Sequence, residues 1–193
     1  MRSFSFAKLL VIGFVIATIV RIWFVQIYEV GGDSMSPTLL NSERVLVQKI
    51  DTALRRGDLV VIDANQTFEF QLESSPGEKF LRILGFETLD KQLVVKRVIA
   101  VGGDTLQCCD ESGRLILNGK PLIEGYLAER ASADEFNVQV TDGHVWVMGD
   151  NRDNSRDSRD LLGQPGGGMI PDTKIIGKVH SVIWPPARIR SLN

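Results

Sequence analysis

The stretch Leu93-Val94-Val95-Lys96-Arg97-Val98-Ile99-Ala100-Val101 is an aliphatic run interrupted by two adjacent cations. Further runs rich in β-branched residues are separated by turn residues and lie at 44–50, 59–62, 145–148 and 175–184. At 115–123, two short runs flank Asn118-Gly119, a dipeptide that favours the type I′ turn of a β-hairpin. No long stretch of this region has the 3.6-residue periodicity of an amphipathic helix, so we predict a mostly β fold.

Composition and charge limit the function classes. The chain has 193 residues, of which 44% are hydrophobic and 24% charged, a balance typical of a folded protein. Its net charge of −2 provides no basic surface for nucleic acid. The first residues are nevertheless basic, because they include Arg2, Lys8 and Arg21, while the remainder is mildly acidic. The length therefore suits one domain with a basic, apolar appendage.

An apolar run from Leu9 to Tyr28 precedes the β region. Crossing the hydrocarbon core as a helix takes about 20 residues, which this run provides, and Arg21 lies close enough to its end to reach the lipid headgroups. The basic N-terminus predicts a cytoplasmic start and a body on the outer face. A cleaved secretory signal and a buried globular helix are the alternatives. The first usually has a shorter apolar region and a small-residue cleavage site, and the second has polar periodicity.

We accordingly predict four parts of the chain: a cytoplasmic N-terminus at 1–8, a transmembrane anchor at 9–28, an extracytoplasmic β domain at 29–193, and a small β subdomain inserted at about 105–143. Two segments of the body lack strand patterns. Segment 64–92 is interpreted as a satellite apolar cluster or as a surface resting on the membrane, and the glycine-rich segment 163–168 as a flexible loop.

The chain's two cysteines, Cys108 and Cys109, are adjacent. Across a trans peptide their Cα atoms would lie about 3.8 Å apart, shorter than the usual disulfide range of about 4.4–6.8 Å. In a strand their side chains would also point to opposite faces. With His144 and His180 they lack the spacing of a zinc site. We therefore expect two thiols and no metal.

A serine nucleophile and a lysine base are candidates for chemistry. Ser34 follows two glycines, whose conformational freedom allows backbone N–H groups near Ser34 to face a developing oxyanion. A serine needs a base, and Lys96 stands in an aliphatic run where desolvation would lower its pKa by several units. The alternative is an edge strand in which Lys96 and Arg97 are both solvated.

A third polar segment, Gly149 to Arg159, directly follows a hydrophobic run. It is rich in Asp and Asn, but it lacks the ligand spacing of a calcium loop, and its arginines oppose a cation. Paired charges that fix a polar turn are the better interpretation.

These segments together resemble type I signal peptidases, the Ser-Lys enzymes that release exported proteins from their signal peptides. The family pattern appears in order at Ser34-Met35, Pro37-Thr38-Leu39, Arg56-Gly57-Asp58, Lys96-Arg97, Gly102-Gly103-Asp104 and Gly149 to Arg159. The Lys96 block, the two cysteines and the Asn-Gly hairpin are most similar to actinobacterial members. The resemblance implies a signal-peptidase/LexA-like β-barrel-type catalytic domain behind one N-terminal transmembrane helix.

The resemblance also implies roles for individual residues. Ser34 would be the nucleophile, Lys96 the general base, and Ser155 the group that orients the lysine amine. The Ser34 backbone N–H would supply one oxyanion donor; Gly32 stands where some members have a second, serine donor. Supporting ion pairs would come from Asp150, Asp157, Arg97 and Arg159, and substrate contacts from Val30, Gly32, Met35 and Val95.

The implied function is that of a membrane-anchored serine endopeptidase. It would remove signal peptides from preproteins emerging from the export machinery, after small residues at Ala-x-Ala type sites, with no metal or cofactor. The lipid bilayer would be its second partner. Three alternatives remain: a self-cleaving Ser-Lys repressor, which would need a DNA-binding N-terminus; a signal peptidase that uses His144 or His180 instead of Lys96; and a membrane-tethered binding or assembly protein with an inactive signal-peptidase-like domain.

Overall fold

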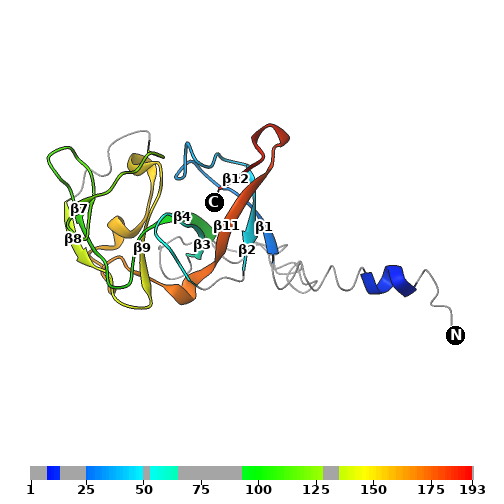
Figure 1. Cartoon of the computed structure of the whole chain (residues 1–193), viewed down its shortest axis with the longest axis horizontal. Helices are drawn as coiled ribbons and strands as arrows, with labels where there is room; N and C mark the ends of the chain where they lie inside the picture. Colours follow the sequence, from blue (N-terminus) through cyan, green and yellow to red (C-terminus); the bar gives the residue numbers. More distant parts are fainter. Residues whose placement is uncertain (1–7, 14–24, 50–52, 65–92, 128–134, 193) are drawn as a thin grey trace, which may run out of the picture.

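The computed structural model describes residues 8–13, 25–49, 53–64, 93–127 and 135–192. Residues 8–13 are helical, and the remaining described residues form strands, turns and single 3-10 turns, so the predicted mostly β fold is confirmed (Figure 1). The strands are β1 (Val25–Glu29), β2 (Arg44–Gln48), β3 (Leu59–Asp63), β4 (Leu93–Val101), β5 (Thr105–Cys108), β6 (Ile116–Leu117), β7 (Lys120–Pro121), β8 (Phe136–Gln139), β9 (His144–Met148), β10 (Ile170–Pro171), β11 (Ile175–Trp184) and β12 (Arg190–Ser191). The 3-10 turns are η1 (Arg152–Asn154), η2 (Ser158–Leu161), η3 (Asp172–Lys174) and η4 (Pro186–Arg188).

The strands form two antiparallel sheets. The larger runs in the order β1-β2-β11-β3-β4-β9-β10, with β12 paired to β11, and the smaller in the order β7-β6-β5-β8. Within the described part of the chain, the path of the larger sheet ends at β1 and β10 and does not return to its start, so the sheet is open rather than a closed barrel. In Figure 1, β7 and β8 lie at one end of the molecule and β1, β2 and β11 lie toward the other.

Strand β4 is an interior strand, which buries both of its cations. It pairs with β3, where Lys96 is opposite Val60, and with β9, where Arg97 is opposite Met148. Only 3% of Lys96 and 9% of Arg97 is exposed. The edge-strand alternative is therefore wrong, because β4 is paired on both sides and both cations are buried.

The predicted anchor ends too late in the sequence. Val25 to Tyr28 lie in β1 and pair with β2, with Tyr28 opposite Val45. Hydrophobicity alone does not separate an apolar helix from the apolar strand that continues it, so the boundary was placed wrongly. Among the described residues, no helix has the combination of length and hydropathy needed to span a membrane. Residues 14–24, in the middle of the predicted anchor, are outside the described residues.

The prediction of two thiols is also wrong, because Cys108 and Cys109 form a disulfide. The prediction assumed a trans peptide between them. The Cys108–Cys109 peptide is cis, and it brings the two Cα atoms to 3.0 Å. Cys109 also lies outside β5, which ends at Cys108, so the two side chains are not successive residues of one strand.

The hairpin at Asn118-Gly119 is confirmed. Both residues have the positive φ of a type I′ turn, 52° and 76°, and they connect β6 to β7. The Asn118 side chain also accepts from Thr105 N at 2.9 Å, which ties the turn to β5. Of the two segments without strand patterns, residues 65–92 are outside the described residues. Gly168, in the other, packs against Trp146, since a Cβ there would lie 2.9 Å from the ring.

Gly177 provides a test of the central packing. A Cβ on this residue of β11 would lie 2.5 Å from the carbonyl oxygen of Gln48 and 2.9 Å from Val47 Cγ1. We expect Gly177→Ala to lower the free energy of unfolding by about 1–3 kcal/mol, because β2 and β11 must separate. Gly163→Ala is the control, since no atom lies within 4 Å of its added methyl. Denaturant melts of the two variants decide; equal stabilities would contradict the packing described.

Candidate active site

Ser34 lies on a loop that two buried side chains hold in place. The loop follows β1, and Met35 and Leu39 are almost fully buried in the apolar cluster beneath it. Ser36 N donates to Asp33 O at 3.0 Å, which closes a turn around Ser34, and Leu39 N donates to Met35 O at 2.8 Å in the turn that follows. The half-buried Ser34 hydroxyl is thereby directed at β4, where Lys96 Nζ donates to Ser34 Oγ at 2.9 Å.

The environment of Lys96 favours the neutral amine. Burial removes water from the ammonium and lowers the pKa of Lys96 from 10.5 to about 8. The negative charge of Asp157 opposes this shift, while the positive charge of Arg159 reinforces it. With a pKa near 8, about one fifth of the lysine is neutral at pH 7.4, whereas an unperturbed lysine is about a thousandfold depleted in that form.

Ser155 fixes the second side of the amine. Lys96 Nζ donates to Ser155 Oγ at 3.0 Å, so the nitrogen lies between two serine hydroxyls from distant parts of the chain. Ser155 is in turn hydrogen-bonded to the side chain of Asp157. This chain of contacts restricts the lysine to one orientation toward Ser34.

Asp157 is the charged centre of the polar segment from Gly149 to Arg159, which we call the polar loop. Its carboxylate accepts from Arg159 Nε at 2.9 Å and from Gly149 N at 3.0 Å. Burial opposes ionisation of this carboxyl group, but the hydrogen bonds and charge of Arg159 hold the pKa of Asp157 below its usual value. Asp157 therefore stays ionised and links the start of the loop to its end.

Arg97 and Asp150 form the other ion pair of the site. Arg97 Nε and Nη2 donate to the two Asp150 carboxylate oxygens at 2.8 and 2.6 Å, a bidentate geometry. Arg97 Nη1 donates to Gly57 O at 2.9 Å. The structure thus brings together the six residues proposed from sequence as catalytic or supporting besides Ser34: Lys96, Arg97, Asp150, Ser155, Asp157 and Arg159.

Two residues of the same loop, Gly149 and Asn151, make contacts that the sequence did not indicate. A Cβ at Gly149 would lie 2.2 Å from Ser155 Oγ and 2.4 Å from Ser34 O, so only glycine fits between the two serines. Asn151 N donates to Ser34 O at 3.0 Å and Asn151 Nδ2 donates to Asp33 O at 3.1 Å. The polar loop therefore holds the backbone of the Ser34 loop as well as the amine.

Two residues that contact arginines of the site, Glu124 and Tyr126, were also missed. Glu124 pairs with Arg152, and the ring of Tyr126 lies 3.9 Å from the guanidinium carbon of Arg97. Both belong to a short irregular segment after β7, where neither periodicity nor a motif gives a signal.

The four positions expected to contact substrate divide into two groups. Val30 and Met35 are buried in one apolar cluster, and half-buried Val95 packs against it beside Lys96 on β4. Gly32 is exposed, has a φ of +87°, and donates from its N–H to Asn41 Oδ1 at 3.1 Å. Three of the four therefore form an apolar base next to the Ser34 loop.

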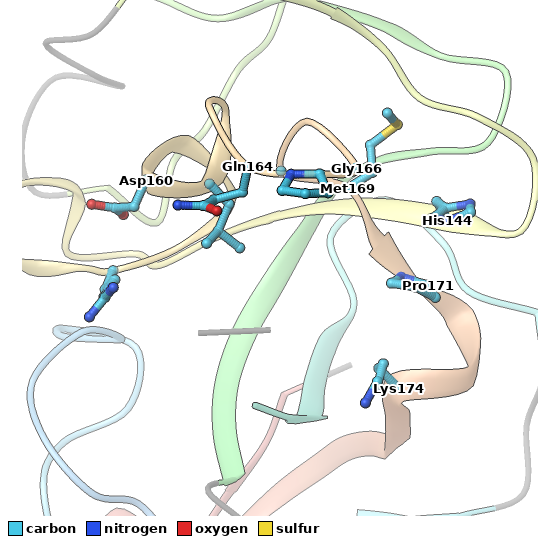
Figure 2. A pocket seen from close by; sticks show the side chains of 11 residues that line it. His144, Asp160, Gln164, Gly166, Met169, Pro171 and Lys174 are labelled. Carbon is cyan, nitrogen blue, oxygen red and sulfur yellow. The ribbon is translucent and has the colours of Figure 1, made fainter. Parts of the chain in front are cut away.

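A pocket of about 400 Å³ lies beside the site (Figure 2). Asp160 and His144 are at opposite ends of it in Figure 2. The negative charge of Asp160 is near enough to Lys96 to favour its ammonium form. At the other end of the pocket, His144 Nδ1 lies 3.0 Å from Asp142 O. Within the described ranges, no group of three or more His, Cys, Asp or Glu side chains is arranged to hold a metal ion.

Comparisons with known proteins find similar chains in one family. The family model described as signal peptidase, peptidase S26, matches residues 3–184. A signal peptidase I of Mycobacterium tuberculosis (strain ATCC 25618 / H37Rv) is 34% identical over 224 residues, covering 98% of this chain and 76% of the relative. Signal peptidase I S of Bacillus subtilis (strain 168) is 34% identical over 203 residues, covering 98% and 93%. A crystal structure of a signal peptidase I from Enterococcus faecalis V583 is 23% identical, with a TM-score of 0.45, covering 65% and 96%.

Substitutions of the two neighbouring charges should move the Lys96 pKa in opposite directions. Asp157→Asn removes a negative charge that favours the ammonium, so the pKa falls below about 8. Arg159→Gln removes a positive charge that opposes it, so the pKa rises. The side-chain ¹⁵N shift of Lys96, assigned with Lys96→Met, measures both, with exposed Glu111→Gln as control. Shifts of the same sign would contradict this account of the amine's surroundings.

Proposed function

The chain belongs to the signal peptidase family, peptidase S26, and is an enzyme that removes signal peptides; from this premise we propose that it is a membrane-anchored serine endopeptidase with Ser34 as nucleophile and Lys96 as general base. The observation that carries the proposal is the 2.9 Å separation of Lys96 Nζ and Ser34 Oγ in a site where Lys96 is 3% exposed. The similarity to a mycobacterial relative confirms the expected likeness to actinobacterial members.

In the proposed mechanism, neutral Lys96 takes the proton from the Ser34 hydroxyl as Ser34 Oγ attacks the carbonyl carbon of the scissile peptide bond. The ammonium then gives this proton to the leaving amine, and an acyl-enzyme remains on Ser34. Water, deprotonated by the same amine, attacks the ester and frees the serine. Ser155 keeps the nitrogen oriented through both halves, since it hydrogen-bonds to Nζ at 3.0 Å.

The substrate is a preprotein cleaved after a small residue, at an Ala-x-Ala type site. Support comes from the apolar base of Val30, Met35 and Val95 beside the nucleophile, which suits small apolar side chains. The apolar residues before β1 anchor the enzyme, with the N-terminus cytoplasmic and the catalytic domain on the outer face. Sharing one bilayer with the substrate raises the effective concentration of each without any added contact.

The alternatives are less well supported. His144 Nδ1 lies near Thr141 Oγ1 and Asp142 O, and His180 lines a different hollow with Gln48 and Arg55, so neither takes the place of the amine beside Ser34. A binding or assembly protein without activity has no need to keep a lysine desolvated between two serines.

Substitutions at the dyad test the assignment. Ser34→Ala and Lys96→Arg should each abolish cleavage of an Ala-x-Ala preprotein in detergent, because the first lacks the nucleophile and the guanidinium of the second does not deprotonate in this range. The double variant His144→Asn/His180→Asn is the matched control and should cleave at the wild-type rate. Cleavage by the Ser34→Ala protein at the wild-type rate would refute the proposed mechanism.

The pH dependence tests the lysine separately. Only neutral Lys96 accepts the proton, so kcat/KM should rise as the pH passes through about 8 and level off above it. The sign follows from the lowered pKa: the protonated, inactive form predominates below pH 8. Stopped-time cleavage assays from about pH 6 to about pH 11 measure this limb. A limb centred near the ordinary lysine value of about 10.4 would show that the amine acts in water.

A further inference from the structure

Glu124 and Tyr126 lie on a turn that connects the smaller sheet to the active site. The turn follows β7 and is closed by a hydrogen bond from Leu127 N to Glu124 O at 3.1 Å. Leu122 and Leu127, on either side, pack against the apolar cluster that the smaller sheet shares with β9. The turn is therefore fixed at its base, while Glu124 and Tyr126 extend toward arginines of the site.

Glu124 holds the beginning of the polar loop through Arg152. Their side chains are almost fully buried, and Arg152 donates to both carboxylate oxygens of Glu124, one of them at 3.2 Å. The remaining nitrogen, Arg152 Nε, donates to Gly149 O at 2.9 Å. A displacement of Glu124 would therefore be transmitted through Arg152 to the backbone of Gly149.

Tyr126 contacts the planar face of the Arg97 guanidinium. The Tyr126 ring stacks on the guanidinium, while Asp150 binds the edge of the same group. The Tyr126 hydroxyl donates to Glu124 Oε1 at 2.5 Å, which joins the two contacts into one network. Arg97 is adjacent to Lys96 on β4, so this network reaches both the strand that carries the base and the loop that carries Ser155.

We propose that Glu124 and Tyr126 are positioning residues for the Ser34–Lys96 dyad, a role that rests on the function proposed above. Gly149 is the point where their effect reaches the dyad. Its backbone lies against both Ser34 O and Ser155 Oγ, so a shift of Gly149 displaces the two serines that bind the amine. Neither Glu124 nor Tyr126 touches the reacting atoms, and both act through the arginines.

A purely structural role makes a different prediction from a positioning role. If the network only stabilises the fold, its loss lowers the melting temperature and leaves the folded protein with an unchanged dyad. If it positions the dyad, the folded variants have a loosened site. Water then reaches Lys96, its pKa returns toward 10.5, and turnover slows although substrate binding persists.

The experiment compares Glu124→Gln, Tyr126→Leu and Tyr126→Phe in the full-length protein, with Ile123→Ala and Glu111→Gln as controls. Ile123 is adjacent to Glu124 and 88% exposed, and Glu111 is an exposed carboxylate of the same region. We expect kcat on an Ala-x-Ala preprotein to fall about 10- to 100-fold in Glu124→Gln and Tyr126→Leu with KM nearly unchanged. Tyr126→Phe keeps the stacked ring and should recover most of the kcat.

The Lys96 titration is measured on the same folded variants by ¹⁵N NMR. We expect the Lys96 pKa to rise in Glu124→Gln and Tyr126→Leu and to stay near about 8 in the controls. Variants that melt earlier but keep both the wild-type kcat and the Lys96 pKa would overturn the proposal. So would a Tyr126→Phe protein as slow as Tyr126→Leu, or a kcat loss matched by the controls.

A parallel Ser34→Ala sample separates the two proposals. If Ser34→Ala cleaves like the wild type, the proposed catalytic function is wrong. The Lys96 pKa in the Glu124 and Tyr126 variants then still decides whether the network positions the amine, because that titration does not depend on cleavage. If Tyr126→Leu does not fold, Glu124→Gln and Tyr126→Phe give the same decision.

Discussion

The site depends on keeping one amine away from water. Lys96 lies on the interior strand β4 and is 3% exposed, and this burial brings its pKa to about 8. Without that desolvation, the hydrogen bond from Nζ to Ser34 Oγ would join an alcohol to a permanent ammonium, which cannot accept a proton. The second hydrogen bond of Nζ, to Ser155 Oγ, fixes the direction of the nitrogen.

Charge around the amine is balanced rather than absent. The carboxylates of Asp150 and Asp157 are each paired with an arginine, so the lysine experiences opposing influences and desolvation decides the direction of its pKa shift. The arginines also serve as connectors: Arg97 joins β4 to the polar loop, and Arg152 joins that loop to the smaller sheet through Glu124. Rigid bidentate contacts suit this use, because they fix orientation as well as distance.

The sequence predicted the elements that follow local patterns. The runs at 59–62 and 93–101 and the Asn-Gly turn gave strands and a hairpin, because β-branched residues and positive φ preferences act locally. The aliphatic run around Lys96 made it a candidate base for Ser34, but 62 positions separate the two residues, and the family resemblance was needed to pair them. The start of β1, the disulfide and the contacts of Tyr126 could not be predicted. Each depends on a boundary, a peptide geometry or a tertiary packing that no local pattern encodes.

The pairing of β4 has a chemical consequence. Successive residues of a strand point to opposite faces, so sliding β4 by one position in one direction would bring Arg97 to the place of Lys96. A guanidinium would then stand beside the alcohol, and a guanidinium does not deprotonate in this range. The register of β4 against β3 and β9 thus decides which of the two cations lies beside Ser34, and molecules with the shifted register would be inactive.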